Sequence, residues 1–254
     1  MMDNTTTPIT WSIGSKLKLS EKFALRANIS KNYRVPAMND LYWIGWNNPN
    51  LKPETGYSEE VGVDFISRKE SSSIVARLNA FNNNVLNWII WTPSGSVWTP
   101  NNMEKVWARG LDLSLSYTSN TLNWHWGFEI MGTGTLSTIE KSASPPEIGK
   151  QLAYVPELKA GGSFIISYKS FWFKYSESFT GRRYVTDVNT SYIERYWIGG
   201  VSIEKTFEGK SFSLKSFVRV DNIWNIDYQS VAWYPMPLRN YQIGVSILFN
   251  KPIH

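Results

Sequence analysis

The feature that most constrains this chain is an alternation of apolar and polar side chains that recurs along nearly its whole length. In one segment Val61, Val63 and Phe65 share one parity, while Gly62 and Asp64 share the other. A period of two is that of a β-strand with one apolar face. We count about eleven such segments, each bounded by residues typical of turns. The sequence therefore predicts an all-β chain of antiparallel strands.

Charged residues occupy the polar parity deep inside the predicted strands, namely Arg26, Arg77, Asp112, Glu129, Lys215 and Arg219. An unpaired charge in a dry core costs several kcal/mol, so two sheets packed face to face could not hold them. A barrel lumen that is filled with water or with a plug can hold them. Short turns such as Glu208-Gly209-Lys210 alternate with longer connections, expected over Thr92–Ser96 and over about Ser137–Lys150, as in transmembrane barrels. We therefore predict the wall of an antiparallel transmembrane β-barrel; the alternative is a soluble β-domain rich in aromatic residues.

Composition favours the barrel. Aromatic residues make up 15% of the chain, with 13 Trp and 13 Tyr, which suits the two aromatic belts of a membrane barrel. No stretch approaches the roughly 20 consecutive apolar residues of a membrane helix. The net charge is +5, and no stripe of Lys and Arg interleaves with aromatic residues, so we expect no nucleic-acid partner. A lipopolysaccharide-facing surface could use the positive excess, although solubility explains it equally well.

The sequence shows no recognisable catalytic or metal site. The absence of cysteine excludes disulfides and thiolate ligands. Neither of the two histidines, His125 and His254, stands in a nucleophile or metal-ligand arrangement, and His125 is better explained as a polar residue lining the lumen. Two carboxylate pairs could act as acid and base but are better explained as strand-end and loop groups: Glu59 with Glu60, and Asp40 with Glu54. We expect no enzymatic activity, no metal and no cofactor.

Four sub-motifs follow one another in the segment from Lys31 to Phe65. They are Tyr33-Arg34-Val35-Pro36, Asn39-Asp40-Leu41-Tyr42, Asn48-Pro49-Asn50-Leu51-Lys52-Pro53-Glu54 and Glu59-Glu60-Val61-Gly62. Together they resemble the mid-barrel signature of TonB-dependent outer-membrane receptors. The form Asn-Asp-Leu-Tyr-Trp is similar to cobalamin receptors of the Bacteroidetes type, although siderophore receptors share much of it.

The carboxyl end carries the same resemblance. Asp221-Asn222-Ile223-Trp224-Asn225 with Tyr228, followed by a loop over Pro235–Arg239, is similar to the penultimate strand and loop of this family. The last predicted strand, Tyr241–Phe249, ends on an aromatic residue, which resembles the signal read by the barrel-assembly machinery. Asn250–His254 follow that aromatic residue and depart from the pattern.

The resemblance implies a barrel of twenty-two strands, so residues 1–254 are expected to form its C-terminal half, without the plug domain. Residues Met1–Pro8 have neither a basic nor an apolar region of a signal peptide. We therefore expect the export signal, the plug and the earlier strands on a longer precursor or on a separate chain of a split receptor, unless the gene is interrupted upstream.

The resemblance further implies an outer-membrane receptor for a scarce nutrient, most simply cobalamin or a siderophore. TonB would act through the plug of the missing barrel half, and outer-membrane lipid, lipopolysaccharide and a surface lipoprotein are the other expected partners. The alternative is a passive porin or a purely structural wall chain.

The expected ligand contacts lie in two loops, and aromatic side chains flanked by amides define them: Tyr42, Trp43, Trp46 and Asn47, with Trp233, Tyr234 and Arg239. Such surfaces suit a large, partly apolar ligand such as a corrinoid, and they suit glycans nearly as well. The alternative is that these side chains belong to an interfacial belt or cover a partner lipoprotein.

Overall fold

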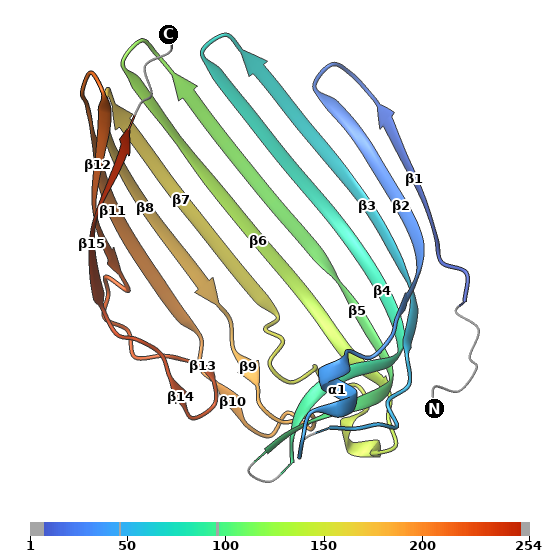
Figure 1. Cartoon of the computed structure of the whole chain (residues 1–254). Helices are drawn as coiled ribbons and strands as arrows, with labels where there is room; N and C mark the ends of the chain where they lie inside the picture. The colour runs from blue at the N-terminus through green and yellow to red at the C-terminus, as the bar shows by residue number, and fades with distance from the viewer. Residues whose placement is uncertain (1–7, 46, 95–96, 250–254) are drawn as a thin grey trace.

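A computed structural model describes residues 8–45, 47–94 and 97–249, and its long strands form one curved antiparallel sheet (Figure 1). This part of the chain gives the sheet eleven strands, as predicted. In spatial order they are β1 (Trp11–Lys18), β2 (Phe23–Arg34), β3 (Glu54–Lys69), β4 (Ser72–Ser94), β5 (Val97–Asn120), β6 (Trp124–Lys141), β7 (Leu158–Tyr168), β8 (Phe171–Thr180), β11 (Tyr196–Glu208), β12 (Phe212–Asp221) and β15 (Asn240–Phe249). Each strand pairs with the next one in this order, so the all-β antiparallel prediction is confirmed.

The remaining elements are short and lie at one end of the sheet (Figure 1). They are the helix α1 (Met38–Tyr42), the 3-10 turn η1 (Pro145–Glu147), and two small hairpins, β9 (Arg183–Tyr184) with β10 (Tyr192–Ile193) and β13 (Gln229–Val231) with β14 (Tyr234–Pro235). None of the helices among the described residues is long and apolar enough to cross a membrane.

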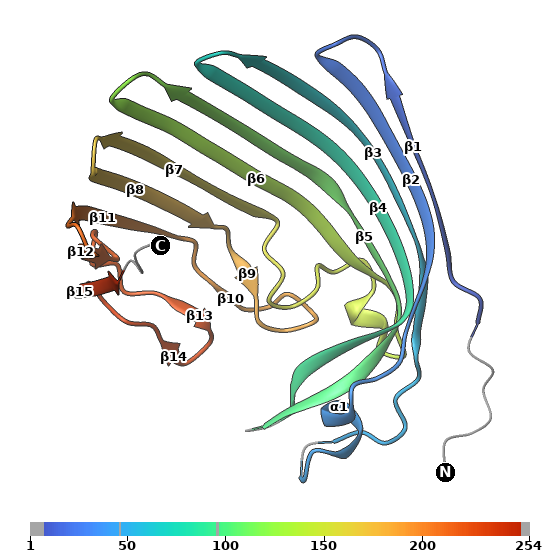
Figure 2. The same cartoon turned by 45° about the horizontal axis from the view of Figure 1, so that its top comes forward.

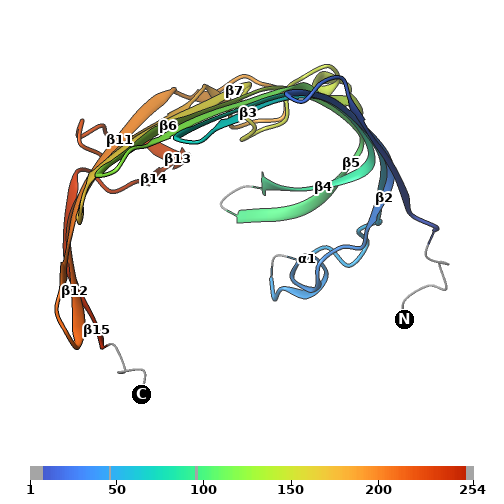
Figure 3. The ribbon, with the colours of Figure 1, turned by 90° about the horizontal axis from the view of Figure 1, so that it is seen from above.

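Three strand boundaries differ from the sequence expectation. The loop expected over Thr92–Ser96 is wrong for Thr92–Ser94, because β4 and β5 keep pairing as far as Ser94 and Val97; Gly95 and Ser96 lie outside the described residues. The connection expected over about Ser137–Lys150 lies later in the chain, because β6 continues to Lys141 and β7 begins only at Leu158. At 23 and 24 residues, β4 and β5 exceed the roughly 10 residues that cross a bilayer. Their far ends leave the wall and bend over the concave side of the sheet (Figures 2 and 3).

The convex face carries the apolar parity. Leu17, Leu25, Val63, Leu78 and Leu113 form one cross-strand row, and every one of them is at least 36% exposed. An apolar surface of this extent is unfavourable in water and suits lipid. Near the short turns, the same face carries aromatic pairs with ring centroids 4.6 to 4.9 Å apart, namely Phe23–Phe65, Tyr117–Trp126 and Trp124–Tyr168. These pairs match the belt expected where a barrel meets the interface.

The polar parity faces the concave side, as predicted. Its clearest cluster surrounds Asp64, whose side chain is 6% exposed. Nε of Arg26 lies 2.9 Å from this carboxylate, Nε of Arg77 3.8 Å and Nζ of Lys16 3.9 Å. On the neighbouring strands, Asp112 accepts a hydrogen bond from Thr133. The charges predicted for the lumen are therefore paired or hydrogen-bonded at this level of the wall.

A small apolar core supports the loop end of the concave face. Met103, Val106, Ile139 and Leu152 are buried together, and Trp88, Ile90 and Val155 pack against them. The segment 142–157 thus folds back over β5 and β6, and it fixes the base of the projecting β4–β5 hairpin.

Candidate ligand-binding site

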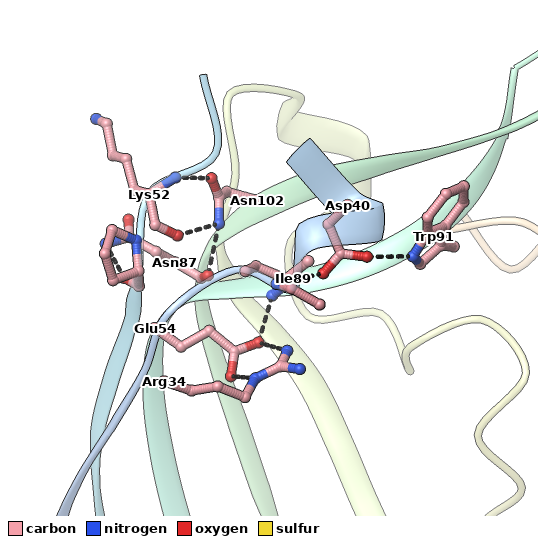
Figure 4. Close-up of polar contacts among 10 residues, drawn as sticks. Arg34, Asp40, Lys52, Glu54, Asn87, Ile89, Trp91 and Asn102 are labelled. Carbon is pink, nitrogen blue, oxygen red and sulfur yellow. Dashed lines mark hydrogen bonds and ion pairs between the residues drawn. The ribbon is translucent and has the colours of Figure 1, made fainter. Parts of the chain in front are cut away.

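The candidate site is built around α1 and the projecting β4–β5 hairpin. Asp40, in the first turn of α1, is 7% exposed and accepts two hydrogen bonds (Figure 4). Its Oδ2 accepts from the backbone N–H of Ala37 over 3.1 Å, and its Oδ1 accepts from Nε1 of Trp91 over 2.9 Å. One buried carboxylate therefore caps the helix and holds the hairpin against it.

A second carboxylate fixes the hairpin where it leaves the wall. Glu54 is 9% exposed and receives both Nε and Nη2 of Arg34, the former over 2.6 Å (Figure 4). Its Oε1 also accepts from the backbone N–H of Ile89 over 2.7 Å. Asn87 lies two residues earlier at φ 56°, a left-handed conformation that asparagine tolerates better than most residues. Asp40 and Glu54 thus have structural partners, which supports their assignment as loop and strand-end groups.

Asparagine side chains replace the ladder bonds that the proline-rich loop cannot make. Asn102 accepts from the backbone N–H of Lys52 over 2.8 Å and donates to the carbonyls of Lys52 and Asn87 (Figure 4). Asn48 donates to the carbonyl of Pro100 over 3.1 Å. The loop between β2 and β3 is consequently tied to the hairpin at Asp40, Asn48 and Lys52.

Between α1 and the hairpin lies a cavity of about 630 Å³. Its walls include three indoles, Trp43, Trp91 and Trp98. Trp98 also contacts Tyr154, with ring centroids 5.1 Å apart. The cavity presents aromatic faces and the Asn39 amide to a ligand, and both oxygens of the Asp40 carboxylate in its lining accept hydrogen bonds from the protein. We call it the tryptophan cavity.

Of the first predicted group, Trp43 lines the tryptophan cavity and is half-exposed. Tyr42 lies on α1 and is also exposed. Asn47 braces the loop, because its Nδ2 donates to the carbonyl of Leu41 over 3.0 Å. Trp46 lies outside the described residues, as do the amino-terminal stretch before Pro8 and the tail after Phe249.

The second predicted group lies elsewhere. Trp233, Tyr234 and Arg239 belong to the segment after β12, which passes through β13 and β14 on the opposite side of the arc from α1 (Figure 3). Trp233 lines a separate cavity, Tyr234 is exposed, and the backbone N–H of Arg239 donates to the Asn225 side chain over 3.1 Å. The structure therefore does not combine the two groups into one site.

Sequence reasoning missed Trp91 and Trp98. Both belong to the tryptophan-dense run Trp88–Trp98, of which Thr92–Ser96 was expected to form a loop. The density of indoles in that run was the available signal. What the sequence did not reveal is that the run folds back over the concave side.

The family description "TonB dependent receptor-like, beta-barrel" matches residues 2–223. The chain therefore belongs to the TonB-dependent receptors, which are β-barrel proteins of the outer membrane of Gram-negative bacteria, and its location is the outer membrane.

Two relatives are vitamin B12 transporters named BtuB. One, from Vibrio vulnificus (strain YJ016), is 30% identical over 115 residues, which cover 44% of this chain and 18% of that protein. The other, from Vibrio vulnificus (strain CMCP6), is 26% identical over 242 residues, which cover 94% of this chain and 36% of that protein. This chain thus spans little more than a third of the relative that it matches over nearly its whole length.

Solved structures share the fold. The copper transporter OprC superposes with a TM-score of 0.68 at 14% identity, covering 94% of this chain and 39% of that one. The siderophore receptor PirA from Acinetobacter baumannii gives 0.66 at 17% identity, covering 95% and 41%. At these identities the likeness establishes the barrel wall and nothing about the ligand.

Proposed function

We propose that this chain belongs to a receptor that takes up a scarce nutrient across the outer membrane, driven by TonB through a plug domain that lies outside residues 1–254. The observation that carries the proposal is the tryptophan cavity at the loop end. Its three indoles suit a large ligand with conjugated or apolar faces, and the Asp40 carboxylate beside them disfavours an anionic ligand. A corrinoid such as cobalamin fits this chemistry better than an anionic ferric siderophore, which is the second candidate.

We also propose that residues 1–254 are the C-terminal half of the barrel. Each end strand is paired on one side only, β1 with β2 and β15 with β12. Both end strands run toward the end that carries the short turns (Figure 1). A second copy would therefore meet β1 and β15 in parallel, which an antiparallel barrel does not allow. We call the missing part of the barrel the complement. It must supply an odd number of strands, and its two end strands must run antiparallel to β1 and β15.

The partners follow from this arrangement. The proposed complement carries the plug that TonB engages, and the convex face contacts outer-membrane lipid and lipopolysaccharide. The exposed aromatic loops could additionally contact a surface lipoprotein. The family consists of transport receptors, and we propose that this chain has no catalytic role.

The test is a fluorescence titration of the receptor, purified from outer membranes in detergent, with cyanocobalamin and with ferric enterobactin as probes. We expect saturable quenching by cyanocobalamin that Trp43→Ala weakens at least tenfold. Trp197→Ala is the matched control, because its indole is 52% exposed, against 50% for Trp43, and lies outside the cavity. Saturable quenching by ferric enterobactin alone would favour a ferric siderophore over cobalamin as the ligand. A passive porin or structural wall would show no saturation with either probe.

A further inference from the structure

The second cavity lies at the loop end beside β10 and β13, which contact each other, and measures about 470 Å³. It shares no lining residue with the tryptophan cavity. Its aromatic lining residues are Tyr192, Tyr196, Tyr228 and Trp233. Nothing in the proposed uptake of a nutrient through the tryptophan cavity accounts for this second aromatic surface.

Trp233 is the second residue of the tight two-residue turn that joins β13 to β14. It follows β13 at φ 68°, in the left-handed region that bulky residues rarely adopt. Its side chain is 91% exposed, so burial does not offset the backbone strain. The side chain of Gln229 accepts a hydrogen bond from the Trp233 backbone N–H over 2.9 Å and fixes this conformation. Gly or Asn would fill this turn position at lower cost, whereas the tryptophan places an exposed indole at the cavity, where it can contact a ligand.

The floor of the cavity is ordered independently of any ligand. Tyr196 and Tyr228 contact each other, with ring centroids 4.6 Å apart at 44°. Arg183, which is 4% exposed, lies beneath them with Cζ 5.0 Å from the Tyr196 ring centroid. Its Nη2 donates to the carbonyl of Gln229 over 2.7 Å, which joins the β9–β10 segment to the segment that carries Trp233. The aromatic surfaces are therefore pre-organised, which lowers the entropic cost of binding.

The polar groups at the rim define the ligand chemistry. Glu194, Arg195 and Asp227 line the cavity and are exposed. With Arg183 beneath the floor, two carboxylates face two guanidinium groups, and this balance of charge suits a neutral ligand. Carboxylates and a guanidinium can accept and donate several hydrogen bonds to neighbouring hydroxyls. A pyranose ring offers the matching surfaces, because it has an apolar C–H face and a rim of hydroxyl groups.

We propose that this cavity binds a neutral oligosaccharide, with one sugar ring stacked on the Trp233 indole and its hydroxyls bonded to Asp227, Glu194 and Arg195. The Tyr196–Tyr228 pair forms the floor for the adjoining ring. The site is separate from nutrient uptake and anchors the receptor to, or recognises, a glycan at the cell surface.

The test measures binding of maltohexaose, cellohexaose, chitohexaose and galactohexaose to the detergent-purified receptor by titration calorimetry. We expect at least one of them to bind, with affinity reduced tenfold or more by Trp233→Ala and by Asp227→Asn. Trp233→Tyr should restore most of it, because a stacking ring remains. Trp43→Ala should leave saccharide binding unchanged while it weakens nutrient binding.

Folding is checked by heat-shifted mobility on a gel, which an exposed side chain such as Trp233 should not affect. Three results would overturn the proposal: none of the four probes binds, binding survives Trp233→Ala in folded protein, or binding is lost in Trp43→Ala.

Discussion

Trp91 donates its indole N–H to Oδ1 of Asp40 over 2.9 Å, across 51 positions of sequence, and this bond joins the β4–β5 hairpin to α1. The bond therefore fixes the position of Trp91 in the wall of the tryptophan cavity. The other oxygen of Asp40 accepts the Ala37 N–H, so both oxygens of the carboxylate have partners within the protein.

Replacing Asp40 should therefore loosen the hairpin. In Asp40→Asn one oxygen becomes an NH2 group, which cannot accept a hydrogen bond, so either Ala37 or Trp91 loses its partner. We expect a cost of about 1–3 kcal/mol, expressed as faster amide exchange in residues 88–92. Asn39→Ala, on the same helix, is the control. Equal exchange in the two variants would show that the bond does not hold the hairpin.

The convex face should reject charge. Leu113 is 49% exposed on the apolar parity, and an Arg there should cost about 2–4 kcal/mol near the bilayer midplane. Ser116 lies on the polar parity of the same strand and opposite Glu129, so Ser116→Arg should cost little. Urea unfolding in lipid vesicles measures both variants. Equal costs at the two positions would favour a soluble β-domain over a membrane wall.

The two ends of the sheet should lie on opposite sides of the membrane. Lys150 is exposed in the long connection after β6, and Lys210 is exposed in the short β11–β12 turn. Trypsin added to intact cells should cut after Lys150 and spare Lys210, which becomes accessible once the outer membrane is permeabilised. Cleavage after Lys210 alone in intact cells would invert the topology.

Asp187 should make the loop between β9 and β10 sensitive to pH. Burial, and secondarily the charge of Glu147, raise the pKa of its carboxyl above the ordinary value of 3.8, and its Oδ1 is buried without a hydrogen-bond partner. The folded loop therefore binds the proton more tightly than the open loop does. Its extra stability is fully present below the ordinary pKa and is lost as pH rises through the raised value.

Amide exchange of residues 184–192, corrected for the intrinsic pH dependence of exchange, measures this effect. Opening should become more frequent as pH rises from about 4 to 7, and Asp187→Asn should flatten the dependence. The variant Asp227→Asn, at an exposed carboxyl of the next loop, should retain the full dependence. A flat profile in the unsubstituted protein would contradict the assignment.

The wall was predictable from sequence because its cause is local. Strand β2 spans the predicted Phe23–Arg34, since the alternation of side chains and the turn at Ser20–Lys22 both lie within a dozen residues. The hairpin tip was not predictable in the same way. Thr92 and Pro93 are typical of a loop. They nevertheless belong to β4, because they pair with residues of β5, and the local sequence does not show this pairing.

The site was predictable only in part, for a related reason. Trp43 was chosen because it stands in an aromatic loop, but its partners Trp91 and Trp98 reach it through the bend at Asn87 and the contacts of Asp40 and Glu54. Trp43 and Trp233 were grouped because both stand in aromatic loops, and the local sequence does not show how far apart those loops lie. The described residues instead form two cavities, each with its own aromatic wall.

The most direct test of the half-barrel assignment is the behaviour of residues 1–254 expressed alone behind a signal peptide. The free edges of β1 and β15 would each leave a row of backbone groups unpaired in hydrocarbon, at several kcal/mol per group. We predict no heat-modifiable, detergent-stable monomer on a gel and no steady conductance in planar bilayers, with both restored when the complementary strands and plug are supplied. A closed monomer that conducts by itself would contradict the assignment.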